Sequence, residues 1–524
     1  MNKIILLLNT IKYLKFKQLY YRGYYFIRKK IKGFNYPLSL SSNSNELKFD
    51  FFVHHNKSYK GDNEFEFLNL SKKFDDKIDW NYKEYGKLWT YNLNYFDYLN
   101  QKEITKEEGL KLIYDFIDNL QNIKDGLEPY PISLRGINWI KFLIRYEIKD
   151  KKIDDSLLAQ YYILLDNLEY HLLGNHLLEN GFSLLWGGLY FGDERLLNKA
   201  KEILKEELNE QILDDGGHFE LSPMYHQIIF YRLLDAINLI DNGKLRMDNG
   251  EFIEFLKEKA LSMLQWLKII TFSNGDIPLL NDSANKIAPI SSELFEYANK
   301  LLINHPSRLT LHHSLKTSRY RKIVKNNYEC IVDIGQIGPD YIPGHAHADT
   351  FNFILYTKSP LTLNHSPLIT DTGISTYDIG IARDYERSTK AHNTVEINNT
   401  NSSEVWGGFR VANRAKVIKI EENENYIKAT HNGYEKKFGI LHTREWIFKE
   451  DKIIIKDTLN KKADAVFRLH FDDKIDTDEI LQKVSFDERY KIVDSYVAKE
   501  YNQKIPIKVL EIYFDLELKV EIKI

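Results

Sequence analysis

Two histidines and an aspartate lie close together in the segment 343–349, P-G-H-A-H-A-D, just before an apolar run. The Pro-Gly pair breaks the chain, so an extended segment is expected to begin here. Side chains alternate along an extended chain, which places His345, His347 and Asp349 on one face. Two imidazoles on one face are half of a metal site or of an acid–base site. The alternative is a pair of surface histidines.

Two further polar residues follow this segment at intervals of about one hairpin. Asp371 lies in T-D-T-G after an apolar-rich stretch, and His392 lies in A-H-N-T-V before a strand-like run. Ligands of type His, Asp and His at strand ends suit zinc with an open or water-filled fourth position. The sequence therefore predicts one divalent metal, zinc by ligand type, held by His347, Asp371 and His392.

Two segments in the first half of the chain also carry reactive side chains. Asn175 and His176 open an expected helix, where Asn175 could be only an N-cap and His176 only an exposed residue. Ser222 is expected to cap a later helix that starts at Pro223. Tyr225 then lies in the first turn, where the helix dipole favours a phenolate and so aids proton exchange. The alternative is a tyrosine that anchors the helix start.

Four other residues are candidates for binding substrate. Arg135 could hold a carboxylate or sulfate with two hydrogen bonds, and Trp139 could stack on a sugar ring. The alternative for this pair is a core tryptophan and a helix-capping arginine. Glu220 precedes Tyr225 in the same segment, and Arg387 could add positive charge near the histidines or be a surface arginine.

The pattern G-H-A-H-A-D-x-x-x-F, then T-D-T-G, then R-S-x-x-x-H-N-T-V resembles the C-terminal domain of the heparinase II/III-like polysaccharide lyases. The related alginate lyases share that architecture. The resemblance implies that His347, Asp371 and His392 hold a metal and that His345 faces the substrate. Bond breaking by a lyase uses no water, so a metal-activated water is unnecessary and the metal is expected to be structural.

The segments around Asn175-His176 and S-P-x-Y-H are similar to the same family. The resemblance implies that Asn175 and His176 neutralise a substrate carboxylate and that Tyr225 is the catalytic tyrosine. The expected reaction is β-elimination on a uronate-containing polysaccharide, with an unsaturated uronate end as product. Tyr225 would both take the C5 proton and protonate the leaving O4 oxygen when that proton and the leaving group lie on the same face of the sugar. His176 or His345 would be the base when they lie on opposite faces.

Hydrophobic periodicity predicts a helical part followed by a β part. A helical period runs from about residue 105 to 304, with short loops that favour antiparallel helix pairs. Beyond a linker at 305–327, short strands separated by turn residues favour a β-sandwich. We expect an α+β chain with a basic segment (1–45), an incomplete (α/α) toroid (46–310) and an antiparallel β-sandwich (311–524).

Composition places few limits on the partner. The 524 residues include 72 Lys and Arg against 75 Asp and Glu, so a net charge of −3 gives no general attraction to polyanions. We expect an anionic polysaccharide substrate and no nucleic acid. Two other functions remain open: a metal-dependent hydrolase with zinc-bound water, and a non-catalytic glycan-binding protein. The oligomeric state is not predicted.

The first 45 residues hold nine basic residues, no acidic residue and many aromatics. Such a helix could lie on an anionic membrane surface, or it could pack on the body with its lysines in solvent. The start of the chain has no recognisable secretion signal, and no apolar run is long enough to span a bilayer. We therefore expect a cytoplasmic protein, with peripheral contact at the inner membrane face as a further hypothesis.

Overall fold

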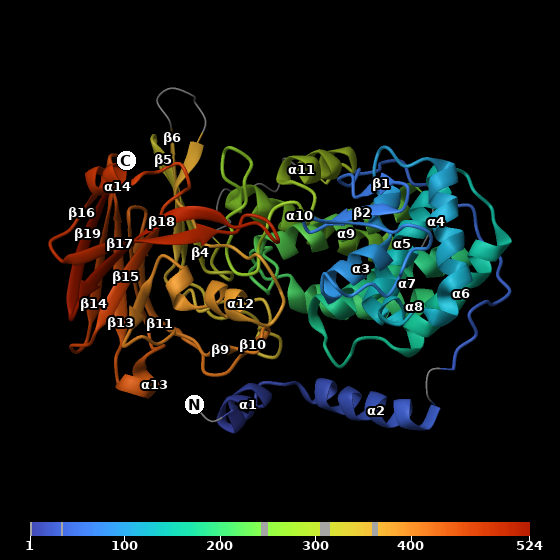
Figure 1. Cartoon of the computed structure of the whole chain (residues 1–524), viewed down its shortest axis with the longest axis horizontal. Coiled ribbons are helices and arrows are strands. Elements are labelled where there is room, and N and C mark those ends of the chain that lie inside the picture. Colours follow the sequence, from blue (N-terminus) through green and yellow to red (C-terminus); the bar gives the residue numbers. More distant parts are fainter. Residues whose placement is uncertain (1–2, 33–34, 243–249, 304–314, 359–364) are drawn as a thin grey trace.

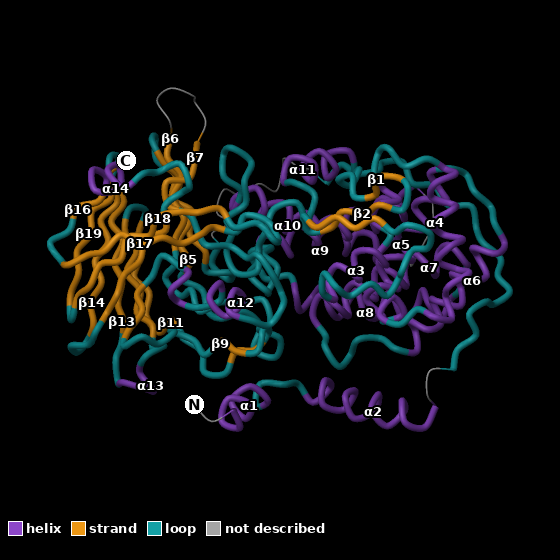
Figure 2. Tube along the Cα trace, viewed as in Figure 1, coloured by secondary structure: helices purple, strands orange, loops and turns teal. Residues whose placement is uncertain are grey.

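The computed structural model describes residues 3–32, 35–242, 250–303, 315–358 and 365–524. Helices make up most of the first half of the chain, and strands make up most of the second (Figure 1). Two helices near the N-terminus run along one edge of the molecule (Figure 2). The predicted boundary at residue 310 and the first part of the predicted linker lie outside the described residues.

The helical half is built from hairpins, and side chains cap several of its helices. Thr105 and Glu108 form the predicted capping box at the start of α4. Asp150 and Asp193 cap α6 and α8 with their side chains. The helices are α1 (Lys3–Ile11), α2 (Phe16–Lys32), α3 (Lys87–Tyr95), α4 (Lys106–Asn119), α5 (Pro129–Arg145), α6 (Lys151–Asp166), α7 (Gly174–Phe191), α8 (Glu194–Gln211), α9 (Pro223–Asn242), α10 (Glu251–Ile270), α11 (Ser291–Lys300), α12 (Ile381–Glu386), α13 (Glu435–Phe438) and α14 (Thr477–Lys483).

One hydrophobic core runs through this helical half and includes the fully buried side chains of Trp139, Trp186 and Trp266. A buried ion pair crosses it. Lys141 on α5 lies 2.9 Å from Asp235 on α9, and their side chains are 0% and 1% exposed. The hydroxyls of Tyr231 and Tyr297 complete the hydrogen bonding of this pair. The pair therefore joins two helices at a point where neither charge reaches water.

The strands form antiparallel sheets. They are β1 (Tyr59–Gly61), β2 (Glu64–Phe67), β3 (Leu70–Lys73), β4 (Tyr320–Val324), β5 (Tyr328–Asp333), β6 (Phe353–Lys358), β7 (His365–Ile369), β8 (Val395–Ile397), β9 (Val405–Trp406), β10 (Arg410–Val411), β11 (Val417–Asn423), β12 (Tyr426–His431), β13 (His442–Phe448), β14 (Lys452–Leu459), β15 (Ala465–His470), β16 (Val484–Ser485), β17 (Arg489–Val497), β18 (Ile505–Phe514) and β19 (Glu517–Lys523). The larger sheets have the orders β11-β12-β13-β14-β19-β16, β17-β18-β15-β8 and β4-β5-β6-β7.

These three sheets enclose a second core, as the β-sandwich prediction requires. Trp446 and Ile455 from the six-stranded sheet pack in it with Phe467 and Leu510 from one four-stranded sheet and Leu355 from the other. The apolar-rich pattern over residues 505–524 on its own predicts one long strand, and that prediction is wrong. The apolar stretch 505–524 is two strands, β18 and β19, because the chain turns at residues 515–516 and the strands enter different sheets. Apolar alternation continues across that short turn and conceals it.

We expect Lys141→Met to lower the free energy of unfolding by about 3–5 kcal/mol, because it leaves the Asp235 carboxylate buried and unpaired. Denaturant unfolding measures this change. Lys300→Met is the matched control, since Lys300 pairs with Glu296 on the surface of α11 and such pairs contribute little. Equal effects of the two substitutions would contradict the importance assigned to the buried pair.

Candidate active site

The site residues gather where the helical half meets the β half, around the carboxylate of Asp282. Asp282 lies in the loop between α10 and α11. It accepts hydrogen bonds from His345 Nδ1 and His347 Nε2, each at 2.8 Å, and from Arg383 Nη2 at 2.7 Å. Burial alone would raise the Asp282 pKa, but Arg383 and the two histidines hold it well below its usual value.

The bond to Asp282 determines what His345 can do. With Nδ1 donating to the carboxylate, Nε2 is left as a proton acceptor. The His345 ring lies against the Tyr225 ring, with 4.1 Å between centroids. The Tyr225 hydroxyl lies 3.1 Å from that of Tyr377. An imidazole and a phenol, the two side chains most suited to proton exchange, are thus in contact.

Tyr225 occupies the first turn of α9, as predicted, and its N–H donates to Ser222 Oγ at 3.2 Å. The expectation of a phenolate favoured near neutral pH was wrong. Burial raises the Tyr225 pKa well above its ordinary value, an effect that Tyr501 reinforces. Desolvation disfavours the charged phenolate. Tyr225 is therefore protonated at neutral pH and suited to donate a proton.

A second imidazole–carboxylate pair lies at the start of α7. His176 Nδ1 lies 3.0 Å from Glu169 Oε1, so His176 Nε2 is also a free acceptor. The His176 side chain is 32% exposed and its ring lies 4.7 Å from that of Tyr130. Burial lowers the His176 pKa, but Glu169, with help from Glu220, more than offsets this and leaves the pKa raised.

Asn175 and Glu220 connect the two imidazoles. The Asn175 amide donates to both carboxylate oxygens of Glu220, at 3.1 Å and 3.0 Å. Glu220 Oε2 in turn lies 3.9 Å from His345 Nε2. Burial raises the Glu220 pKa. Both Asn175 and Glu220 are buried. Glu220 therefore acts on the site by holding Asn175 and by lying close to His345.

The reading of Asn175 as an N-cap was wrong. The chain enters α7 through two residues in the left-handed region, Leu173 at φ 64° and Gly174 at φ 61°, and the helix already begins at Gly174. Leu173 occupies the N-cap position, but its apolar side chain accepts no hydrogen bond from the first turn. As a non-glycine residue with positive φ it is also strained. This turn directs the Asn175 side chain toward Glu220 and leaves His176 beside Glu169.

Three residues expected to bind substrate lie in the protein interior. Arg135 and Trp139 are 0% exposed on α5; Arg135 bonds to Gln160 and to two backbone carbonyls, and Trp139 is a core residue. Arg387 is buried and donates to the carbonyls of Ala346 and Gly408. These three predictions are corrected, because no polymer can reach these guanidinium groups or this indole. Arg387 instead fixes the backbone of the histidine segment.

The three residues expected to hold metal are buried and partly grouped. His392 Nδ1 lies 2.8 Å from Asp371 Oδ2, and the rings of His347 and His392 have centroids 5.3 Å apart. Among the described residues, no group of three or more His, Cys, Asp or Glu is arranged to hold a metal ion. Asp371 also accepts from Asn352 and from the Gly373 N–H, so both of its oxygens are occupied.

Sequence reasoning missed four residues that shape the site: Glu169, Asp282, Tyr377 and Arg383. Asp282, Tyr377 and Arg383 act through contacts with residues far away in the chain, such as Asp282 with His345, whereas Glu169 pairs with His176 seven residues away. No local pattern marks Asp282, which lies in a loop between helices. The recurrence of arginine four residues apart, at Arg383 and Arg387, was the one available signal for Arg383.

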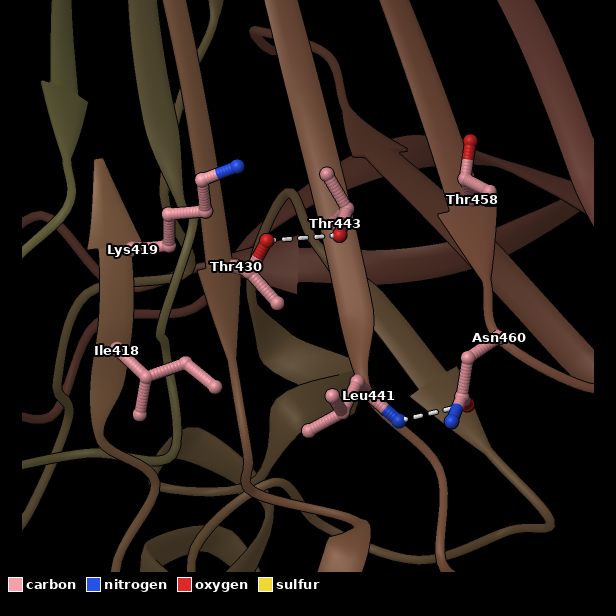
Figure 3. A pocket seen from close by; sticks show the side chains of 7 residues that line it. All are labelled: Ile418, Lys419, Thr430, Leu441, Thr443, Thr458 and Asn460. Atoms are coloured by element: carbon pink, nitrogen blue, oxygen red, sulfur yellow. Dashed lines mark hydrogen bonds between the residues drawn. The ribbon is translucent and has the colours of Figure 1, made fainter. Parts of the chain in front are cut away.

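A hollow elsewhere in the β half is not the active site. It measures about 520 Å³ and lies over β11–β14 (Figure 3). Threonines on neighbouring strands form its floor, and Thr430 and Thr443 share a 2.8 Å hydrogen bond. The lining residues are Ile418, Lys419, Thr430, Leu441, Thr443, Thr458 and Asn460. Lys419 is its one titratable side chain, so the hollow lacks an acid–base pair.

We expect Glu169→Gln to move the acidic limb of the kcat/KM profile to lower pH. Glu169 stabilises protonated His176, so its loss lowers the His176 pKa and the neutral base persists to lower pH. Rates measured across pH with wild type and variant test this. Glu179→Gln is the control, because Glu179 pairs with Arg232 instead of with His176. An unmoved limb would assign the base to another residue.

Comparison with known proteins identifies the family and the fold of the chain. A family model described as "Heparinase II/III N-terminus" matches residues 149–308, and one described as "Heparinase II/III-like, C-terminal" matches residues 307–502. A curated heparin-sulfate lyase from Bacteroides stercoris is 22% identical over 327 residues, covering 58% of this chain and 46% of the relative. One from Bacteroides thetaiotaomicron is 29% identical over 122 residues, covering 22% and 17%. The chain thus matches less than half the length of either curated relative.

Solved structures share the fold. Heparinase III matches with a TM-score of 0.64 and 16% identity, over 90% of this chain and 83% of that chain. Heparan sulfate lyase HepC from Pedobacter heparinus matches with a TM-score of 0.56 and 16% identity, over 88% and 81%. This likeness confirms the predicted architecture, an incomplete (α/α) toroid followed by a β-sandwich. With both halves matched by the two family models, the chain belongs to the heparinase II/III-like family.

Proposed function

We propose that this protein is a polysaccharide lyase that cleaves a uronate-containing polymer by β-elimination. One observation carries the proposal: Tyr225 from the helical half contacts His345 from the β half, and each belongs to a hydrogen-bonded group suited to proton transfer. The curated relatives of the matched region are heparin-sulfate lyases, which supports the same class of reaction.

Elimination requires three groups around the sugar. A base takes the proton from C5, which lies next to the uronate carboxylate. The electrons form a C4–C5 double bond, the C4–O4 bond breaks, and an acid protonates the leaving O4. Charge that builds on the carboxylate in the transition state must be stabilised by donors already in place. No water takes part in bond breaking.

The side chains present can fill these roles. Tyr225 is protonated at neutral pH and would donate to O4. His176 and His345 each offer a free Nε2 as base, because each Nδ1 is bound to a carboxylate. Asn175 would donate to the uronate carboxylate. Its amide now donates to Glu220, so an incoming carboxylate competes with Glu220 for the same donor.

We also propose that His347 and His392 hold a divalent metal, with zinc as the ion that suits imidazole and carboxylate ligands. The donor set fits in part. His347 Nδ1 and His392 Nε2 are buried without a hydrogen-bond partner, as unprotonated ligand nitrogens would be. Asp371, the predicted third ligand, instead accepts from His392 Nδ1, a contact that orients a metal-bound histidine. When bound, the ion would hold the two loops together, and no proton transfer depends on it.

We expect protein purified without a His tag to contain about one zinc per chain by elemental analysis. His392→Ala should lose the metal and lower the Tm, because the site is structural. His431→Ala is the control, since His431 is buried in the same half but bonds to His442. Metal-free wild type, or full metal content in His392→Ala, would contradict the assignment. Asp371→Asn tests whether Asp371 is a direct ligand. The metal should be lost if Asp371 binds it and retained if Asp371 only orients His392.

We expect Tyr225→Phe to reduce turnover about 10²–10⁴-fold while leaving folding and substrate binding nearly unchanged, because a positioned proton donor is lost. Steady-state kinetics and thermal unfolding measure the two effects. Tyr377→Phe is the matched control, since it removes only the partner of the Tyr225 hydroxyl and should cost far less. A larger loss in Tyr377→Phe than in Tyr225→Phe would exchange their roles.

The product distinguishes elimination from the two other functions considered. A lyase leaves a C=C bond conjugated to the carboxylate, which absorbs in the ultraviolet. Hydrolysis or binding alone leaves no such chromophore. Purified protein should therefore produce ultraviolet absorbance with at least one polymer in a panel of heparosan-like, alginate-like and bacterial capsular polysaccharides. Chain shortening without absorbance would favour a hydrolase.

A further inference from the structure

The large apolar side chains that remain exposed are concentrated on α1 and α2. Among the described residues, more than half of the exposed large apolar side chains fall within residues 4–31, with Phe16 and Ile31 each 81% exposed. No residue of α1 is buried. The exposed set consists of Ile4, Ile5, Leu7, Leu8, Ile11, Phe16, Leu19, Tyr20, Tyr24, Phe26, Ile27 and Ile31. We call this set the N-terminal apolar face.

The opposite stripe of α2 already has partners. Gln18 Nε2 donates to the Leu172 carbonyl at 3.0 Å, and the Tyr25 hydroxyl donates to the Leu168 carbonyl at 2.6 Å. The Tyr21 ring stacks on Tyr170 with 4.6 Å between centroids. These contacts recur at helical spacing and fix one face of α2 on the body. The N-terminal apolar face therefore points away from the body.

Positive charge accompanies this face. Residues 1–45 contain nine basic residues and no acidic one. Lys15 and Lys17 turn inward and pair with Glu210 and Glu206 on α8. Lys12, Lys29 and Lys30 are exposed beside the apolar residues. Apolar and aromatic side chains flanked by lysines match the chemistry of a lipid headgroup boundary.

We propose that the N-terminal apolar face binds the surface of an anionic lipid bilayer. A second copy of the chain is a poorer occupant, because a two-fold contact would bring like charges together. A nucleic acid or a free polysaccharide would leave the apolar side chains unused. Among the described residues no helix is long and apolar enough to cross a membrane, so α1 and α2 would lie in the plane of the interface.

Docking in this way would place the active site near the lipid surface. α2 holds the backbone at Leu168 and Leu172, which leads directly into Asn175 and His176. Gln18 also donates to the carbonyl of Tyr341, four residues before His345. Lipid binding does not depend on the chemistry at that site, so failure of one proposal would leave the other intact.

The test is co-sedimentation of the full chain with vesicles of phosphatidylglycerol and phosphatidylcholine, or of phosphatidylcholine alone, across a salt series. We expect binding to the anionic vesicles that weakens as salt increases. Replacing Lys12, Lys29 and Lys30 by Gln should weaken it on the order of 100-fold, since each lysine near an anionic surface contributes roughly fivefold. Replacing Leu8, Phe26 and Ile27 by Ser should abolish sedimentation, because the apolar contacts with the lipid are lost.

Two matched controls keep the result specific. In one control variant, Gln replaces Lys456, Lys461 and Lys474, and in the other, Ser replaces Ile418, Leu481 and Tyr490. All six are exposed residues of the β half, so both variants should bind vesicles as the wild type does. Thermal unfolding checks that every variant folds. No sedimentation with anionic vesicles at low salt would overturn the proposal. So would equal losses in the controls, or a dimer in light scattering that the Leu8, Phe26 and Ile27 variant abolishes.

Discussion

The buried carboxylate of Asp282 is the interaction on which the site depends. Removing a carboxylate from water costs several kcal/mol, and only excellent pairing offsets this. Asp282 obtains that pairing from Arg383 and from His345 and His347. Because Asp282 belongs to a loop of the helical half and its partners belong to the β half, the same bonds that satisfy the charge also hold His345 against Tyr225. Replacing Asp282 would leave Arg383 buried without its counter-ion.

The parts of the fold that depend on local sequence were predictable. The capping box at Thr105 and Glu108 and the start of α9 after Ser222 follow from short-range hydrogen bonds, and both are present. The change from helical to alternating periodicity correctly marked the β-sandwich, since each period reflects one way of burying an apolar face. Short motifs also singled out Asn175, His176, Tyr225 and His345 as candidates.

The parts that depend on tertiary packing were not predictable. Arg135 and Trp139 are buried in the core, although their side chains would suit a sugar site equally well. Burial of the Tyr225 hydroxyl raises its pKa, and its position in the first helical turn gives no sign of that burial. The Asp282–His345 pair and the exposed side of α2 likewise arise from the way distant segments meet. Such contacts leave no pattern in one sequence.

In the proposed reaction, the two halves of the chain together supply an acid, a base and an amide donor for elimination. Cleavage in water enriched with heavy oxygen tests it most directly, with a polymer that the protein degrades. Elimination breaks C4–O4 without water, so mass spectrometry of the new ends should show no heavy oxygen and an unsaturated terminal uronate. One heavy oxygen incorporated at each cleavage, with saturated ends, would contradict the account and establish hydrolysis.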